Sequence, residues 1–110
     1  MERFRKYLGM DINLENVSNQ QRLEAFGIAC RYAPDPPEDF DEFEFGTDFA
    51  GQDNIVITVT VELGKIKKIM FGVADAEDPD IIRSLTGPQL NAFLSKKGDQ
   101  LVGFFDYITG

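Results

Sequence analysis

The strongest pattern in the sequence is the alternation of apolar and polar residues over 54–63, NIVITVTVEL. Its odd positions from Ile55 to Leu63 are all apolar, whereas the even positions after Val56 are threonine or glutamate. β-Branched residues in a period of two are typical of a strand with one buried face. We therefore predict a strand at 54–63 and, after the turn signal Gly64-Lys65, a partner strand at 66–74.

The register of this hairpin can be predicted from parity. A two-residue loop would place Val61 opposite Lys68 and so mix the apolar and polar faces. A three-residue loop keeps odd positions opposite odd positions, and we therefore favour it. The residues expected on one buried face are Ile57, Val59, Val61, Ile69 and Phe71.

Helical spacing is found before this hairpin in two segments. Residues 2–8 form a candidate short helix ending at Gly9. Residues 18–32 predict a longer helix, because Ser18 is a good N-cap and the prolines that follow end the helix. Cys30 lies on its apolar face and is expected to be largely buried.

After the hairpin, residues 80–97 predict a helix in one or two pieces, with Thr86 as an N-cap and Gly98 as the stop. Residues 100–109 fit a helical stripe as well as a strand, and their β-branched and aromatic content favours the strand. A further short strand is expected where Phe43 and Phe45 alternate with glutamates.

The elements then follow the order α-β-β-β-α-β. Hairpin-linked strands between helices are typical of an α+β fold with an antiparallel sheet. We predict one domain over residues 1–110, with three to four strands and helices mainly on one face.

Composition excludes much common chemistry. The chain of 110 residues has no histidine and one cysteine, so it can assemble no Ser-His or Cys-His nucleophile, no usual zinc site and no internal disulfide. It also has no GxGxxG or GxxxxGK[ST] phosphate-binding motif. We therefore expect a protein that is not an enzyme and that needs no cofactor.

Charge narrows the class of partner. The net charge of −8 argues against direct binding to nucleic acid or to an anionic membrane, and leaves a basic protein as the expected partner. The N-terminus lacks the apolar core of a secretory signal, and no apolar stretch is long enough to span a membrane. We expect a cytoplasmic protein, or one in the host cytoplasm if it is viral.

The charge is concentrated in one segment. Nine acidic residues lie between Tyr32 and Lys65 with no lysine or arginine among them, whereas the rest of the chain is nearly neutral. Carboxylates interleaved with phenylalanines offer both charge steering and apolar anchors for a partner. The candidate partner-binding residues are Glu38, Asp39, Phe40, Asp41, Glu42, Glu44, Asp48 and Phe49. The alternative is an acidic face that only keeps the protein dissolved.

The leading hypothesis is a stoichiometric inhibitor of a basic protein, such as an immunity protein, an antitoxin or a phage protein that mimics nucleic-acid charge. A chaperone or assembly adaptor is the first alternative, either monomeric or homodimeric, with an exposed apolar patch from Phe104, Phe105 and Tyr107. A carboxylate enzyme or a calcium site is the second. The acidic run fails the EF-hand pattern, because Phe43 and Glu44 occupy its fifth and sixth positions when Asp39 is the first.

Overall fold

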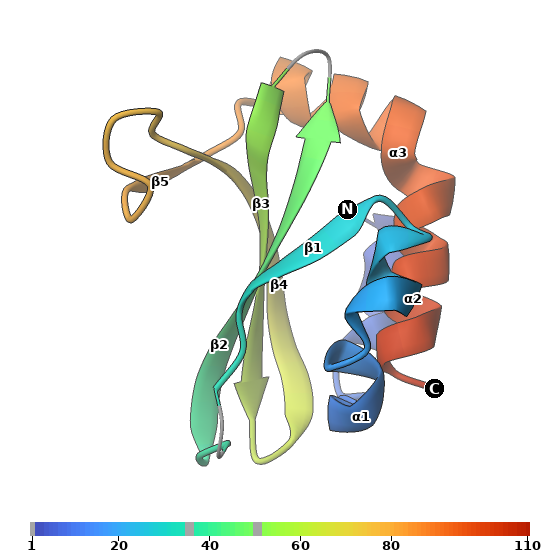
Figure 1. Ribbon diagram of the computed structural model, residues 1–110. Helices are drawn as coiled ribbons and strands as arrows, with labels where there is room; N and C mark the ends of the chain where they lie inside the picture. Colours follow the sequence, from blue (N-terminus) through green and yellow to red (C-terminus); the bar gives the residue numbers. More distant parts are fainter. Residues whose placement is uncertain (1, 35–36, 50–51) are drawn as a thin grey trace.

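The fold is α+β, with helices on one side of a single antiparallel sheet (Figure 1). A computed structural model describes residues 2–34, 37–49 and 52–110. For residues 49, 52 and 53 it describes the backbone but not the side chain. The elements are a 3₁₀ helix η1 (Glu2–Tyr7), helices α1 (Leu14–Val17) and α2 (Gln20–Glu24), strands β1 (Ile28–Tyr32), β2 (Phe40–Phe49), β3 (Gln52–Glu62), β4 (Lys65–Ala74) and β5 (Ile82–Ser84), and helix α3 (Gly87–Ile108). The strands are ordered β1-β2-β3-β4-β5 in the sheet, so the expected count of three to four strands and the expected element order are wrong.

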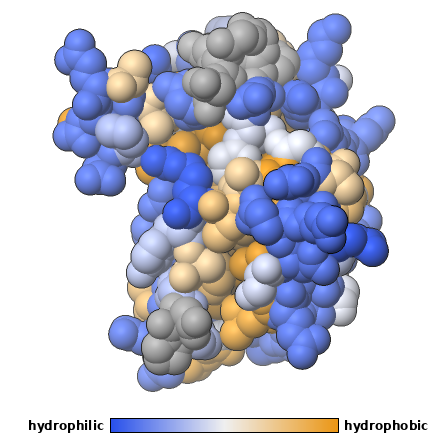
Figure 2. All heavy atoms as spheres, in the orientation of Figure 1, coloured by the Kyte–Doolittle hydropathy of each residue, from blue (hydrophilic) through white to orange (hydrophobic). Residues whose placement is uncertain are grey.

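The hydrophobic core lies between the sheet and α3. The ring centroids of Phe45 and Phe104 are 5.0 Å apart, and Phe4 of η1 packs against Phe71 and Phe105. These side chains are almost completely buried, so each removes a large apolar area from water. Seen edge-on, apolar residues follow the seam between the sheet and the helices (Figure 2).

The central hairpin has the predicted faces but not the predicted loop. Val59 pairs with Ile69 and all five residues of the expected set are buried, which confirms the predicted face. The loop, however, has two residues, Leu63 and Gly64, because Glu62 pairs with Lys65. The register shifts next to Val61, and this bulge restores odd-to-odd pairing within the strand instead of in the loop.

The predicted helix over 18–32 is wrong except for the five residues of α2, and its N-cap is Asn19, whereas Ser18 is the C-cap of α1. Helix α2 ends at Glu24, and Gly27 adopts a left-handed conformation with φ of 71°. A Cβ at this glycine would meet the side chain of Gln100 at 2.7 Å. The chain reverses there and β1 pairs with β2, so Cys30 lies opposite Phe45 in the sheet and is only partly buried.

The predicted strand over 100–109 is also wrong, because α3 continues to Ile108. Its stripe of Leu101, Phe104, Phe105 and Ile108 is fully buried, and burial of this stripe outweighs the strand propensity of the segment. Two of these residues belong to the patch expected for a chaperone, which therefore does not exist as an exposed surface.

The N-cap of α3 at Thr86 is as predicted, but the helix expected from residue 80 is wrong before it, because Ile82–Ser84 pair with β4 as strand β5. The expected stop of the helix is wrong as well. The Thr86 hydroxyl accepts a hydrogen bond from the backbone N–H of Gln89, and the Gln89 side chain accepts one from the backbone N–H of Thr86. The two bonds form a full capping box. The expected stop at Gly98 is wrong, since this residue lies within the helix where the Arg3 side chain crosses it. Arg3 then reaches Asp99 at 2.6 Å, which holds the N-terminal segment against α3.

Candidate binding surface

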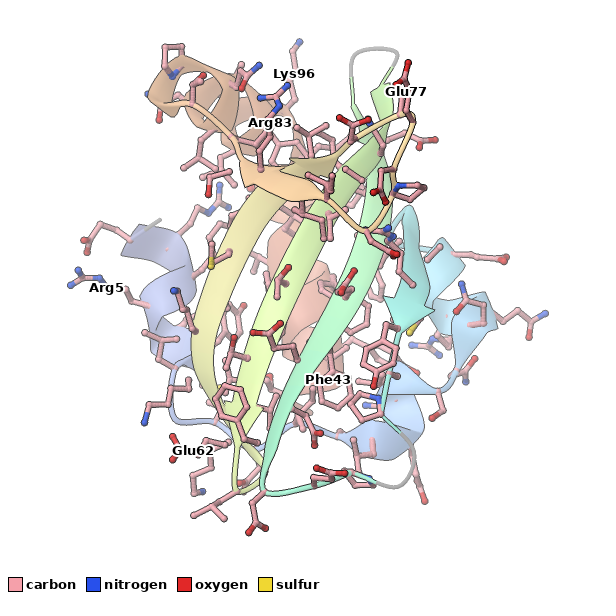
Figure 3. The ribbon with its side chains drawn as sticks, turned by 90° about the vertical axis from the view of Figure 1, so that its left-hand side faces the viewer. Arg5, Phe43, Glu62, Glu77, Arg83 and Lys96 are labelled. Carbon is pink, nitrogen blue, oxygen red and sulfur yellow. The ribbon has the colours of Figure 1, made fainter. Side chains whose placement is uncertain are left out.

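The candidate surface is the sheet face that the helices leave uncovered (Figure 3). Alternation along the strands places the even residues 40–48 of β2, 54–62 of β3 and 68–74 of β4 on this open face. The odd residues 41–47 and 55–61 lie on the inner side. Ile66 of β4 is the exception, because it precedes the register shift and is buried in the core. One cross-strand row contains Glu42, Thr60 and Lys68, and the next contains Glu44, Thr58 and Met70. The uncovered face is therefore a mixture of carboxylates, hydroxyls and a few apolar side chains.

The acids of β2 form a row along one strand. Glu42, Glu44 and Asp48 share the open face, and at about 3.3 Å per residue the row spans about 20 Å. Glu44 is partly buried and lies 3.3 Å from the Arg31 guanidinium, which neutralises part of the row. Glu42 and Asp48 are exposed. The arrangement is thus a linear set of charges, two of them well exposed, rather than one dense cluster.

One candidate residue lies elsewhere. Asp41 shares the parity of Phe43 and points to the inner side of the sheet, where it is 8% exposed. Its carboxylate accepts a hydrogen bond of 2.8 Å from the backbone N–H of Glu38. Asp41 therefore does not lie on the exposed face with Glu42 and Asp48, whereas Glu38 and Asp39 lie exposed just before β2.

Apolar side chains accompany the acids. Phe40 lies on the open face of β2 and is 58% exposed, and Tyr32 of β1 is 56% exposed opposite Glu44. Met70 of β4 is a third apolar side chain on this face and is 38% exposed. The side chain of Phe49, the other aromatic candidate, lies outside the described residues. Exposed aromatic groups beside carboxylates are a composition found at protein-binding surfaces.

One end of the open face is closed by β5. Gly72 allows this close approach, because a Cβ there would meet Ile82 Cγ2 at 2.7 Å and the Arg83 carbonyl oxygen at 2.8 Å. Arg31 also donates a hydrogen bond of 2.9 Å to the carbonyl oxygen of Pro79, which fixes the segment before β5. Val56 beneath this segment is consequently buried although it faces away from the helices.

A cavity of about 700 Å³ lies between this segment and the ends of β1, β2 and β3. Arg31, Asp48, Asn54 and Asp75 contribute its polar lining. The guanidinium is already bound to Glu44 and Pro79, and the Asn54 amide to the Ala74 carbonyl oxygen. Two of these four polar side chains, Arg31 and Asn54, are therefore already engaged in contacts within the fold.

The remaining candidate chemistry gains no support from the geometry. Among the side chains that the structure describes, no three acidic or cysteine groups gather closely enough to hold a metal ion. Burial raises the pKa of the Cys30 thiol, which lowers its thiolate fraction at neutral pH. Within residues 2–34, 37–49 and 52–110, no helix is long and apolar enough to cross a membrane.

Sequence reasoning missed two residues of this surface. Arg31 and Tyr32 were assigned to a helix, yet a bulge in β1 brings Arg31 to Glu44 and Tyr32 opposite it. The available signal was the short alternation from Ile28 to Tyr32 after Gly27, a residue that favours chain reversal.

Comparison of the chain with protein-family models, curated proteins and solved structures finds no match in any of the three.

Proposed function

We propose that this protein is a non-enzymatic binding module that docks a basic protein on the open face of its sheet and inhibits it stoichiometrically. The observation that carries the proposal is the uncovered face itself, where exposed acids of β2 lie beside exposed aromatic side chains. An antiparallel sheet can leave one face in water, but such a face does not need large apolar groups. Their presence beside carboxylates suits a protein partner.

Charge favours a basic partner in particular. The chain carries a net charge of −8, and nine of its acids belong to the segment that contains β2 and its flanks. Exposed charges of one sign steer an oppositely charged protein toward the surface and raise its association rate. Glu42 and Asp48 are free for this role, since no ion pair within the described residues involves either of them.

The apolar groups supply the short-range part of the binding. A rigid strand holds Phe40 in the same row as Glu62, and Tyr32 lies at the other side of β2. Aromatic anchors that become buried in a partner contribute much of the binding free energy at protein interfaces. Inhibition of this kind requires only that the docked module cover the basic site of its partner, so it needs no catalytic side chain.

The test compares two variants of equal charge change. In the first, Glu38→Gln, Asp39→Asn, Glu42→Gln and Asp48→Asn remove four acids around β2. In the control, Glu2→Gln, Glu24→Gln, Glu77→Gln and Asp80→Asn remove four exposed acids elsewhere. Each protein is immobilised and exposed to lysate of its source cells at low and high salt, and the captured proteins are identified and quantified.

We expect the wild type and the control to capture the same basic protein, and the first variant to capture it about 10-fold more slowly at low salt. The difference should shrink at 1 M salt, where the Debye length is about 3 Å. Equal capture by both variants would show that the acids of β2 only solvate the protein.

A further inference from the structure

A groove of about 380 Å³ lies at the hairpin end of the sheet, on the inner side next to the open face. Its apolar walls come from three separate parts of the chain: the start of α1 with the segment before it, the paired strands β2 and β3, and the β3–β4 turn. We call it the hairpin-end groove. Its apolar lining side chains are Ile12, Leu14, Phe43, Val61 and Leu63, with Pro37 at the margin.

Leu63 is the unusual member of this set. It adopts a left-handed conformation with φ of 52°, followed by Gly64 with φ of 81°, as in a type I′ hairpin turn. Asparagine or glycine is preferred at this position because a leucine side chain is strained there. Leu63 is nevertheless 71% exposed. Neither turn geometry nor core packing accounts for a leucine here, whereas contact with a partner would.

The rim of the groove is acidic. Glu38, Asp39 and Asp41 line it, and no described residue of its lining is basic. The hydrogen bond from the Glu38 N–H holds the Asp41 carboxylate in the groove wall. Two lysines of the hairpin are engaged elsewhere, since Lys65 pairs with Asp11 at 2.9 Å and Lys67 pairs with Glu62. Among the described residues, no ion pair involves Glu38, Asp39 or Asp41.

We propose that the hairpin-end groove binds an extended segment of the basic partner in which an arginine or lysine stands next to an aliphatic side chain. The cation would lie against Glu38, Asp39 and Asp41, and the aliphatic group against Leu14 and Leu63. Two side chains suit the volume, which is at the lower end of the range of about 300–1,000 Å³ for small-ligand sites. The inference rests on the proposed function for its basic partner, and adds the place and the chemistry of recognition.

The probe is a synthetic peptide of alternating leucine and arginine. Peptides of alternating leucine and glutamine and of alternating glycine and arginine separate the apolar from the cationic contribution. Affinity is measured by fluorescence anisotropy, and the binding site by backbone amide chemical shifts of the protein. The groove variants are Leu63→Asn, Asp41→Asn and Glu38→Gln, and the matched controls are Ile81→Asn and Glu77→Gln at exposed positions outside the groove.

We expect the leucine–arginine peptide to bind most tightly and to shift the amides of Leu63 and Asp41. Leu63→Asn and Asp41→Asn should each weaken binding by about 5-fold or more, while the controls leave it unchanged. Leu63→Asn relieves strain in the turn, so its melting temperature should equal or exceed that of the wild type. A loss of binding in this variant therefore cannot come from unfolding, and Glu38→Gln serves in place of Asp41→Asn if the latter does not fold.

Several outcomes would contradict the proposal that the hairpin-end groove binds the partner. Equal affinity for the three peptides, no binding of the leucine–arginine peptide, or unchanged binding by Leu63→Asn would each do so. Amide chemical-shift changes confined to Glu42, Glu44 and Thr58 would place the contact on the open face. This result would contradict the groove proposal and leave the proposed function standing. Loss of capture by the four-acid variant together with unchanged peptide binding by the groove variants would separate the two proposals in the same way.

Discussion

The two faces of this sheet differ in how far their side chains are buried by the rest of the protein. On the inner face, Phe43, Phe45, Ile57 and Val59 are completely buried against the helices. On the open face, their neighbours in sequence include Glu42, which is exposed, and Glu44 and Thr58, which are partly buried, and Phe40 of the same face is 58% exposed. Each strand thus contributes to stability mainly with one set of alternating residues and exposes part of the other set. The comparison teaches that a search for function should begin with the residues that stability does not explain.

The largest loss of stability should follow from removing a side chain of α3 that packs against the inner face of the sheet. Phe104→Ala removes a ring that packs against Phe45 at 5.0 Å and Phe105 at 5.1 Å. A buried cavity of this kind typically costs about 3–5 kcal/mol, measurable by urea denaturation. A loss below about 1 kcal/mol would mean that the α3–sheet contact is not the main source of stability.

An intermediate effect should follow where the open face is closed. Gly72→Ala places a methyl group against Ile82 and the backbone oxygen of Arg83, which is not a flexible side-chain end. We expect a loss of about 1–3 kcal/mol and faster hydrogen exchange at the Leu85 amide, which donates to Phe71 O. Gly87→Ala is the matched control, since nothing lies within 4 Å of a Cβ there. Equal stability of the two variants would show that β5 does not lie tightly over β4.

The sequence predicted the two faces of β2, β3 and β4, because a period of two over a β-branched run leaves little choice of fold. It also contained the position of Asp41, whose parity with Phe43 places it on the inner side. β1 was missed, since a five-residue strand after a glycine resembles the end of a helix. The C-terminal part of α3 was missed because strand propensity was given more weight than the spacing of Leu101, Phe104 and Phe105.

The hairpin-end groove could not be predicted from the sequence. Its walls come from residues near 12, 38 and 63, and only the folded chain brings them together. The turn signal was read as Gly64-Lys65, whereas the loop is Leu63–Gly64. A leucine in the first position of such a turn has no pattern that marks it before the register is known.

The most direct test of the division between the faces is a paired measurement on Phe40→Ser, which removes an exposed ring from the open face. The free energy of unfolding and the amount of basic protein captured at low salt are measured on the same preparation. Surface changes of this kind typically alter stability by less than about 0.5 kcal/mol. We expect unchanged stability with capture reduced about 5-fold or more. Unchanged capture with a clear loss of stability would contradict the account, because Phe40 would then serve the fold and not a partner.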